Sequence, residues 1–225
     1  KKAERYEKAR KIAEMLQIEY LLDRKPTQLS GGQQQRVSMA RALVKEPDVL
    51  LLDEPMSNLD ARLKIEIRDE IRRVQQETGI TSIIVTHDQE EAMAIADKIA
   101  ILDNGRIQQY DTPEHLYHYP ANLFVAKFMG NPPMNFIDAA LSADGTRVEG
   151  AGFSLPLEQH MAQGGKKFAG HAVKVGVRSH LMAVHTEKVP QSMEMRLQIA
   201  ENLGKEILIS GMVGDLSLIH ISEPT

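Results

Sequence analysis

The chain has 225 residues, a formal net charge of −4 and no cysteine. This length allows one large domain or two small ones, and the absence of cysteine excludes a disulfide framework and a thiolate metal site. Acids and bases are balanced, so the sequence shows no excess of positive charge that would bind nucleic acid or an anionic membrane. No apolar run reaches the roughly 18–20 residues that span a bilayer. Because Lys1 is neither an initiator methionine nor part of a signal-peptide pattern, we read the chain as a soluble cytoplasmic piece of a longer protein.

Helices and strands alternate along the first part of the chain. Helical spacing of apolar residues predicts helices over residues 3–20 and 33–45, and the apolar run 49–52 is typical of a strand buried in a parallel sheet. A further helix ends at Gly79, and three more elements follow it: a strand over 80–86, a short helix from Asp88 with Glu91 as its capping-box partner, and a strand over 99–102 that turns back into 106–110. This order predicts a three-layer α/β domain with a mainly parallel sheet.

The composition changes after residue 130. Thr112-Pro113 opens a short helix and another covers residues 122–129, so we assign residues 1–130 to the first domain. Beyond Asn131-Pro132-Pro133 the periodicity approaches two, which is typical of strands, for example over 172–177 and 206–210. We therefore predict a small, incomplete β-barrel domain over residues 131–215.

A glycine pair stands at the predicted start of the second helix, in Ser30-Gly31-Gly32-Gln33. Ser30 with Gln33 is a capping box, and an ordinary glycine-rich helix start is one explanation of the motif. The other explanation is an anion site, because two glycines leave the backbone N–H groups and the positive end of the helix open to a phosphate.

Two acids, Asp53 and Glu54, end the buried strand, where ligands of open α/β sheets bind. Asp53 is the candidate Mg²⁺ ligand, through water, and Glu54 is the candidate base that polarises an attacking water. A solvated acidic strand end is the alternative. His87 ends the next strand, and parallel strands should place it beside both acids, although a lone histidine at a strand end is more often structural. Asp60 is a candidate N-cap of the following helix.

The motifs also occur in a fixed order: Leu29-Ser30-Gly31-Gly32-Gln33-Gln34-Gln35-Arg36, Val49-Leu50-Leu51-Leu52-Asp53-Glu54-Pro55, Ser57-Asn58-Leu59-Asp60 and His87. In order and spacing they resemble the ATP-binding-cassette (ABC) ATPases, the motor subunits of many transporters. The resemblance implies ATP and Mg²⁺ as cofactors and a head-to-tail pair of subunits. In that pair Ser30, Gly31, Gly32 and Gln33 contact the ATP of the partner subunit, and the loop with Asp60 couples the two active sites. His87 contacts the γ-phosphate and orients the water.

One element of that family, the phosphate-binding P-loop, has no match in these residues. The nearest candidate is Gly165-Lys166, where His160 replaces the first glycine and Lys167 replaces Ser or Thr. We therefore expect the chain to correspond to the family from the end of its helical subdomain onward. We expect the chain alone to be inactive and to lack tight ATP binding.

Later segments resemble the ATPases of bacterial carbohydrate importers, of the maltose and multiple-sugar types, which carry a C-terminal oligonucleotide-binding-like (OB-like, TOBE) domain. They are Asp111-Thr112-Pro113-Glu114, 119–126, 130–135, 173–178 and 201–204. The chain departs from these relatives at Ser179-His180, and residues 216–225 stop resembling them, so we expect a tail of foreign origin there.

The resemblance implies a sugar-import ATPase on the inner face of the cell membrane, with permease subunits, a second ATPase subunit and indirectly a solute-binding protein as partners, and no nucleic acid. Two alternatives remain open. One is an importer of another solute, such as a polyamine, sulfate, iron or glycerol phosphate. The other is a non-catalytic dimerising or regulatory fragment.

Overall fold

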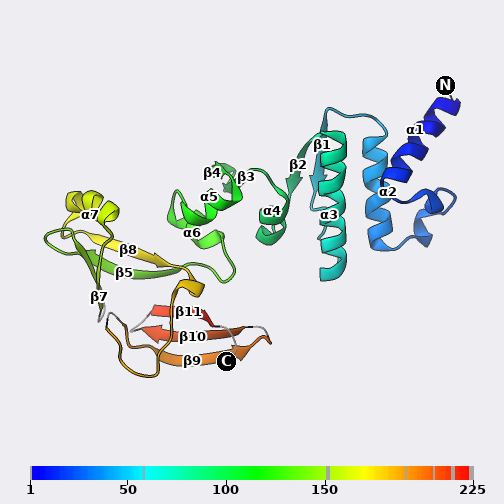
Figure 1. Ribbon diagram of the computed structural model, residues 1–225. Coiled ribbons are helices and arrows are strands. Elements are labelled where there is room, and N and C mark those ends of the chain that lie inside the picture. The colour runs from blue at the N-terminus through cyan, green and yellow to red at the C-terminus, as the bar shows by residue number, and fades with distance from the viewer. Residues whose placement is uncertain are drawn as a thin grey trace. The chain divides into compact units, whose positions relative to one another are not determined.

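The computed structural model describes residues 2–57, 59–150, 153–190, 192–204, 206–213 and 216–222 (Figure 1). The chain divides into two compact units, Lys1–Ile99 and Ala100–Thr225. The boundary that we placed between residues 130 and 131 lies within the second unit and stays a prediction.

The first unit packs helices against a pair of parallel strands. Its elements are α1 (Lys2–Met15), two 3-10 turns (Glu19–Leu21 and Pro26–Gln28), α2 (Gly31–Leu43), β1 (Val49–Asp53), α3 (Ala61–Thr78), β2 (Thr81–Val85) and α4 (Gln89–Ile95). Strands β1 and β2 are in parallel register, with Asp53 opposite Val85. Gly79 ends α3 in the left-handed conformation with φ of 66°, as the sequence predicts.

The helices cover one face of this strand pair. Leu50 is only 3% exposed and lies in a core with Met39 of α2 and Ile67 of α3. On the opposite face Leu51 and Ile83 are 70% and 54% exposed. The α/β class and the parallel pairing are confirmed, but among the described residues this sheet has two strands and helices on one face instead of three layers.

The strand predicted to follow β2 in the parallel sheet pairs elsewhere. β3 (Ile99–Asp103) forms a two-stranded sheet with β4 (Arg106–Asp111). The turn between them has positive φ at Asn104 and Gly105, the arrangement of a two-residue hairpin. Such a hairpin closes a very short loop, so its entropic cost is low, and it forms here as the sequence predicts.

Two short helices follow β4 in the second unit, α5 (Pro113–His118) and α6 (Leu123–Phe128). Each begins with a side-chain cap. Thr112 Oγ1 accepts a hydrogen bond from the His115 backbone N–H at 3.3 Å, and Asn122 Oδ1 accepts one from Val125 at 2.9 Å. These caps satisfy backbone donors that a helix start leaves free.

The remainder of the second unit is β-rich, as predicted. One antiparallel sheet has the order β7-β6-β5-β8 and a second has the order β11-β10-β9. The elements are β5 (Asn135–Leu141), β6 (Arg147–Gly150), β7 (Phe153–Pro156), α7 (Gln159–Gly165), β8 (Ala172–Val177), β9 (Arg196–Asn202), β10 (Ile207–Val213) and β11 (Leu216–Ser222), with 3-10 turns at Lys166–Phe168 and Ser179–Leu181. Both sheets are open, and within the described residues no barrel closes.

The two sheets share a hydrophobic core of Ile137, Val148, Phe153, Val213 and Leu218. The buried Asn135 amide adds a polar link, because it donates to Ile219 O at 2.7 Å and accepts from Ile219 N at 2.8 Å. The segment that we expected to be a foreign tail therefore supplies strand β11 over residues 216–222. Its origin stays a prediction, and residues 223–225 lie outside the described part of the chain.

Candidate active site

The site begins where β1 and β2 end at the same sheet edge. The Glu54 backbone N–H donates to Val85 O at 2.8 Å, which extends the pairing of the strands by one bond. Glu54 then takes a left-handed conformation with φ of 45°, which costs a residue other than glycine on the order of 1–3 kcal/mol. The Ser57 hydroxyl and backbone N–H donate to Glu54 O at 3.1 and 3.3 Å and hold this turn. The local backbone thus fixes the direction in which the Cα–Cβ bond of Glu54 points.

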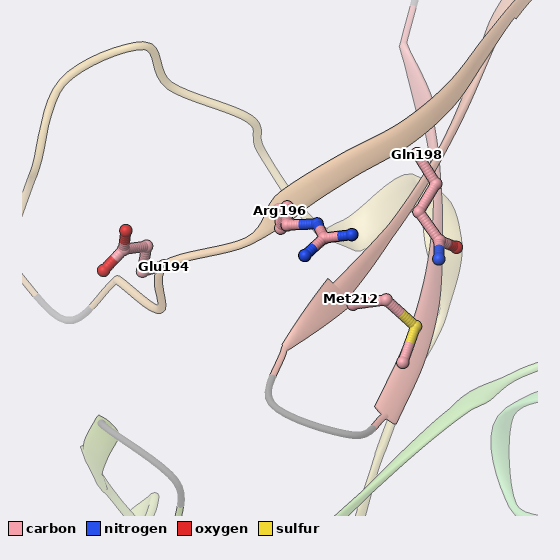
Figure 2. Close-up of a pocket in the computed structure, with 4 residues that line it drawn as sticks. All are labelled: Glu194, Arg196, Gln198 and Met212. Atoms are coloured by element: carbon pink, nitrogen blue, oxygen red, sulfur yellow. The ribbon is translucent and has the colours of Figure 1, made fainter.

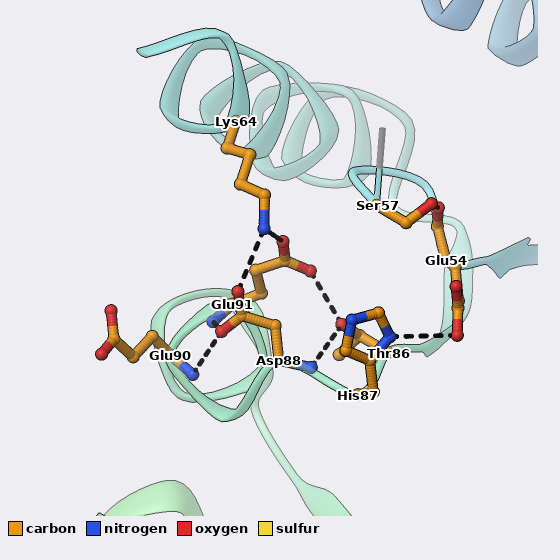
Figure 3. Close-up of polar contacts among 8 residues, drawn as sticks. All are labelled: Glu54, Ser57, Lys64, Thr86, His87, Asp88, Glu90 and Glu91. Atoms are coloured by element: carbon orange, nitrogen blue, oxygen red, sulfur yellow. Dashed lines mark hydrogen bonds and ion pairs between the residues drawn. The ribbon is translucent and has the colours of Figure 1, made fainter. Parts of the chain in front are cut away.

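The His87 ring lies against this carboxylate. Its Nδ1 is 3.1 Å from Glu54 Oε1, as Figure 3 shows. Both side chains remain accessible, with 70% of His87 and 48% of Glu54 exposed. This confirms that consecutive parallel strands bring the two residues together. An imidazole and a carboxylate at hydrogen-bond distance can orient a water molecule and accept its proton.

Asp53 precedes this pair at the carboxyl end of β1 and is exposed. Within the described residues, no group of three or more His, Cys, Asp or Glu side chains is arranged to hold a metal. A single accessible carboxylate nevertheless fits Mg²⁺, which binds through one or two carboxylates and takes its other ligands from water and substrate phosphates. Asp53 as the Mg²⁺ ligand stays a prediction.

The residues on either side of His87 are anchored by a polar network that the sequence did not reveal. Thr86 Oγ1 donates to Glu91 Oε2 at 2.8 Å and accepts from the Asp88 N–H at 3.0 Å. Asp88 Oδ1 caps α4 by accepting from Glu90 N at 3.0 Å and Glu91 N at 3.2 Å. The predicted capping box is therefore half correct: Asp88 is the N-cap, but the Glu91 side chain turns to Thr86.

Lys64 of α3 completes the network. Its Nζ donates to Asp88 Oδ2 at 3.1 Å and forms an ion pair with Glu91 Oε1 at 2.8 Å (Figure 3). The contacts with Glu91 and Asp88 raise the pKa of Lys64 above its ordinary value. Partial burial raises the pKa of Asp88, but the hydrogen bonds from Lys64 and from the start of α4 outweigh it, so the pKa lies below the ordinary value.

The predicted helix start at Ser30 is present. Ser30 Oγ accepts from Gln33 N at 3.4 Å and Gln33 Oε1 accepts from Ser30 N at 3.0 Å, so both halves of the capping box form. The two glycines differ. Gly31 is exposed, whereas Gly32 is buried so closely that an added Cβ would lie 2.8 Å from Leu63 Cδ1. Gly32 therefore has a packing role that the sequence did not indicate.

Asp60 caps α3, as predicted, by accepting from Leu63 N at 3.0 Å. Its neighbour Asn58 lies outside the described residues. We call residues Ser30–Gln33 the Ser30 segment and the loop that ends at Asp60 the Asp60 segment. Since Gly32 packs on Leu63, these two segments are close together. Within the described part of the chain, no hydrogen bond or ion pair joins Ser30 or Gln33 to Glu54 or His87.

A separate hollow in the second unit is lined by Glu194, Arg196, Gln198 and Met212 (Figure 2). It contains none of the predicted site residues, and we assign it no function. In the parts of the chain that the structure describes, no helix has both the length and the apolar character needed to cross a membrane.

Two family models match the chain. Residues 1–57 match the model described as ABC transporter, and residues 130–179 match the model described as MalK OB fold domain. Over 220 residues the chain is 42% identical to the sn-glycerol-3-phosphate import ATP-binding protein UgpC of Vibrio vulnificus, covering 96% of this chain and 57% of that protein. Over 213 residues it is 46% identical to the maltose/maltodextrin import ATP-binding protein MalK of Yersinia pestis, covering 93% of this chain and 57% of that protein.

A third relative, the xylose/arabinose import ATP-binding protein XacK of Haloferax volcanii, is 54% identical over 151 residues, which cover 67% of this chain and 39% of that protein. Among solved structures, cbiO1 from Clostridium perfringens, described as part of the ABC transporter complex cbiONQ, aligns with a TM-score of 0.50 and 34% identity. That alignment covers 52% of this chain and 46% of the other. The chain thus spans little more than half the length of the first two relatives.

Proposed function

Because the chain belongs to the ABC transporter ATP-binding family, we propose that the whole protein is the ATP-hydrolysing subunit of an importer. The observation that carries the proposal is the contact of 3.1 Å between His87 Nδ1 and Glu54 Oε1, at the carboxyl ends of two adjacent parallel strands. Ligands of open α/β sheets bind at this edge. The relatives are named as import ATP-binding proteins, which supports the same activity.

The chemistry would be hydrolysis of the terminal phosphoanhydride bond. Glu54 would accept a proton from a water molecule while the water oxygen forms a bond to the γ-phosphorus. The bond from that phosphorus to the bridging oxygen breaks, and ADP leaves with its electron pair. His87 would contact the γ-phosphate and hold the water in line. Asp53 would hold Mg²⁺, which neutralises phosphate charge when it is bound.

The Ser30 segment would serve the nucleotide of a second subunit. Ser30 and Gly31 stand at the start of a helix of 13 residues, whose backbone N–H groups and positive dipole end favour an anion. The phosphate-binding loop of the family has no match in these 225 residues, so the proposal concerns the whole protein, paired with a second copy. The other proposed partners are permease subunits at the inner face of the membrane and, through them, a solute-binding protein.

We propose a sugar as the cargo. The support is the match of residues 130–179 to the MalK OB fold domain and the two relatives whose names include maltose and xylose/arabinose. Glycerol phosphate is the second candidate, because UgpC is 42% identical over nearly the whole chain. Transport assays with radiolabelled maltose and glycerol 3-phosphate, in cells that carry or lack the protein, would distinguish the two cargoes.

The test of the catalytic proposal is Glu54→Gln in the full-length protein. The amide keeps the shape of the side chain but accepts a proton poorly, so turnover should fall by roughly 10²–10⁴-fold, while ATP-dependent dimerisation persists. Glu66→Gln is a matched control, because Glu66 lies on α3 and forms a surface ion pair with Arg62. Undiminished ATP hydrolysis by the Glu54→Gln protein would refute the proposal.

A further inference from the structure

Lys64 ties the first turn of α3 to the loop that carries His87. The Lys64 ammonium lies between two acids of the α4 start, 3.1 Å from Asp88 Oδ2 and 2.8 Å from Glu91 Oε1. Its own backbone N–H donates to Asp60 O at 2.9 Å. Lys64 therefore contacts both Asp60 and the two acids, Asp88 and Glu91, that follow His87.

The support of His87 is indirect, because the ring itself is 70% exposed and, among the described residues, its hydrogen-bond partner is Glu54. The backbone positions on either side of His87 must therefore set where the ring lies. Thr86 and Asp88 are those positions, and they are joined to each other and to Glu91 by side-chain hydrogen bonds. Lys64 joins this whole group to α3.

The positive charge of Lys64 balances the negative charges of Asp88 and Glu91. The Glu91 side chain is only 8% exposed, and its buried Oε1 lies 2.8 Å from the Lys64 ammonium. Without the ammonium two carboxylates would face each other with no counter-charge, one of them buried, which is costly. The acids would separate or take up protons, and either change would shift Asp88 and the backbone of His87.

We propose that Lys64 is a positioning residue for His87, which links the Asp60 segment to the hydrolytic pair. The inference rests on the proposed function, since it assigns Lys64 a part in the same reaction. If the Asp60 segment touches a second subunit, a shift of the first turn of α3 would reach His87 through Lys64. ATP hydrolysis would then be sensitive to subunit contact without any contact between Lys64 and ATP.

The experiment measures ATP hydrolysis by the full-length protein carrying Lys64→Met, Lys64→Arg or His87→Ala, and by the double variant with Lys64→Met and His87→Ala. Lys64→Met should lower kcat by roughly tenfold to a hundredfold, the range expected for a small misplacement of a catalytic group, and should change KM for ATP by less than about twofold. Lys64→Arg retains the charge and should keep most of the activity. Arg62→Met is the matched control, because Arg62 also lies in the first turn of α3 and forms a surface ion pair.

The His87→Ala background separates positioning from general support of the fold. If Lys64 acts through His87, Lys64→Met should cause no further loss of kcat once His87 is absent. A loss of the same factor in both backgrounds, or a kcat of Lys64→Met within about twofold of the wild type, would overturn the inference. If Lys64→Met does not fold, Glu91→Gln replaces it and the same outcomes apply. Turnover by Glu54→Gln would instead refute the proposed function, so the two failures are distinguishable.

Discussion

Arg178 offers the clearest stability prediction in the chain. It lies directly after β8 and is 5% exposed. Its Nη1 donates to Ala126 O at 3.2 Å and to Met129 O, and its Nη2 donates to Tyr117 O at 2.8 Å. The guanidinium carbon also lies 4.1 Å from the centre of the Tyr117 ring. Arg178 therefore joins the end of α6 and the end of α5 to the β-rich part of the second unit.

The expected cost of Arg178→Met follows from these contacts. A hydrogen bond from a charged donor contributes roughly 1.5–3 kcal/mol, and a desolvated cation–ring contact about 2 kcal/mol. Burial of the charge opposes these gains and also lowers the pKa of Arg178 below its ordinary value. Methionine retains most of the packed volume but leaves three carbonyl oxygens without this donor. We expect the free energy of unfolding to fall by about 2–4 kcal/mol.

Urea denaturation followed by circular dichroism would measure this loss. Arg106→Met is the matched control, because Arg106 is an exposed arginine of β4 in the same unit, and it should change stability by less than about 0.5 kcal/mol. Arg178→Lys should be intermediate, since an ammonium cannot reproduce the planar fork of donors. A loss for Arg178→Met no larger than that of the control would refute the reasoning.

Three further predictions concern single residues. Gly130→Ala should cost about 1–3 kcal/mol in urea denaturation, because φ is 117° and the new Cβ would lie 2.6 Å from Arg178 Nη1; an unchanged midpoint would contradict it. Gly32→Ala should lower the free energy of unfolding by about 1 kcal/mol through overpacking against Leu63, seen as a lower melting temperature, and the neighbouring exposed Gly31→Ala serves as its control. Hydrogen bonds from the Ser142 and Thr146 side chains lower the pKa of Asp144 to about 2. The ionised Asp144 carboxylate should therefore stabilise the folded chain fully above the ordinary pKa of 3.8, and this stabilisation should be lost as pH falls through about 2. A carboxyl ¹³C titration with a midpoint near 3.8 would contradict this.

Local features of the fold could be predicted from the sequence because short-range chemistry decides them. Ser30, Asp60 and Asp88 are helix N-caps, and Gly79 takes the left-handed conformation that ends α3. The meeting of Glu54 and His87 could also be predicted, since two consecutive parallel strands place their carboxyl ends at one edge.

Contacts that depend on how elements pack could not be predicted in this way. Lys64 and Glu91 are far apart in the sequence, and nothing in their spacing indicates that α3 and α4 bring them within 2.8 Å. Arg178 was part of a strand motif in the sequence, and its three carbonyl partners became evident only from the packing of α5 and α6. The covering of one face of β1 and β2, rather than both, likewise follows from tertiary arrangement and not from the strand pattern.

The first turn of α3 lies between the two groups of predicted site residues. Leu63 packs against Gly32 of the Ser30 segment, and Lys64, the next residue, holds the acids beside His87. Successive residues of a helix project about 100° apart, so neighbouring side chains can contact different partners. Asp60 caps this same turn through Leu63 N and accepts the Lys64 N–H at its carbonyl. A displacement of the turn as a rigid unit would therefore move the contact with the Ser30 segment and the support of His87 together, so the two groups need no direct bond to respond to one another.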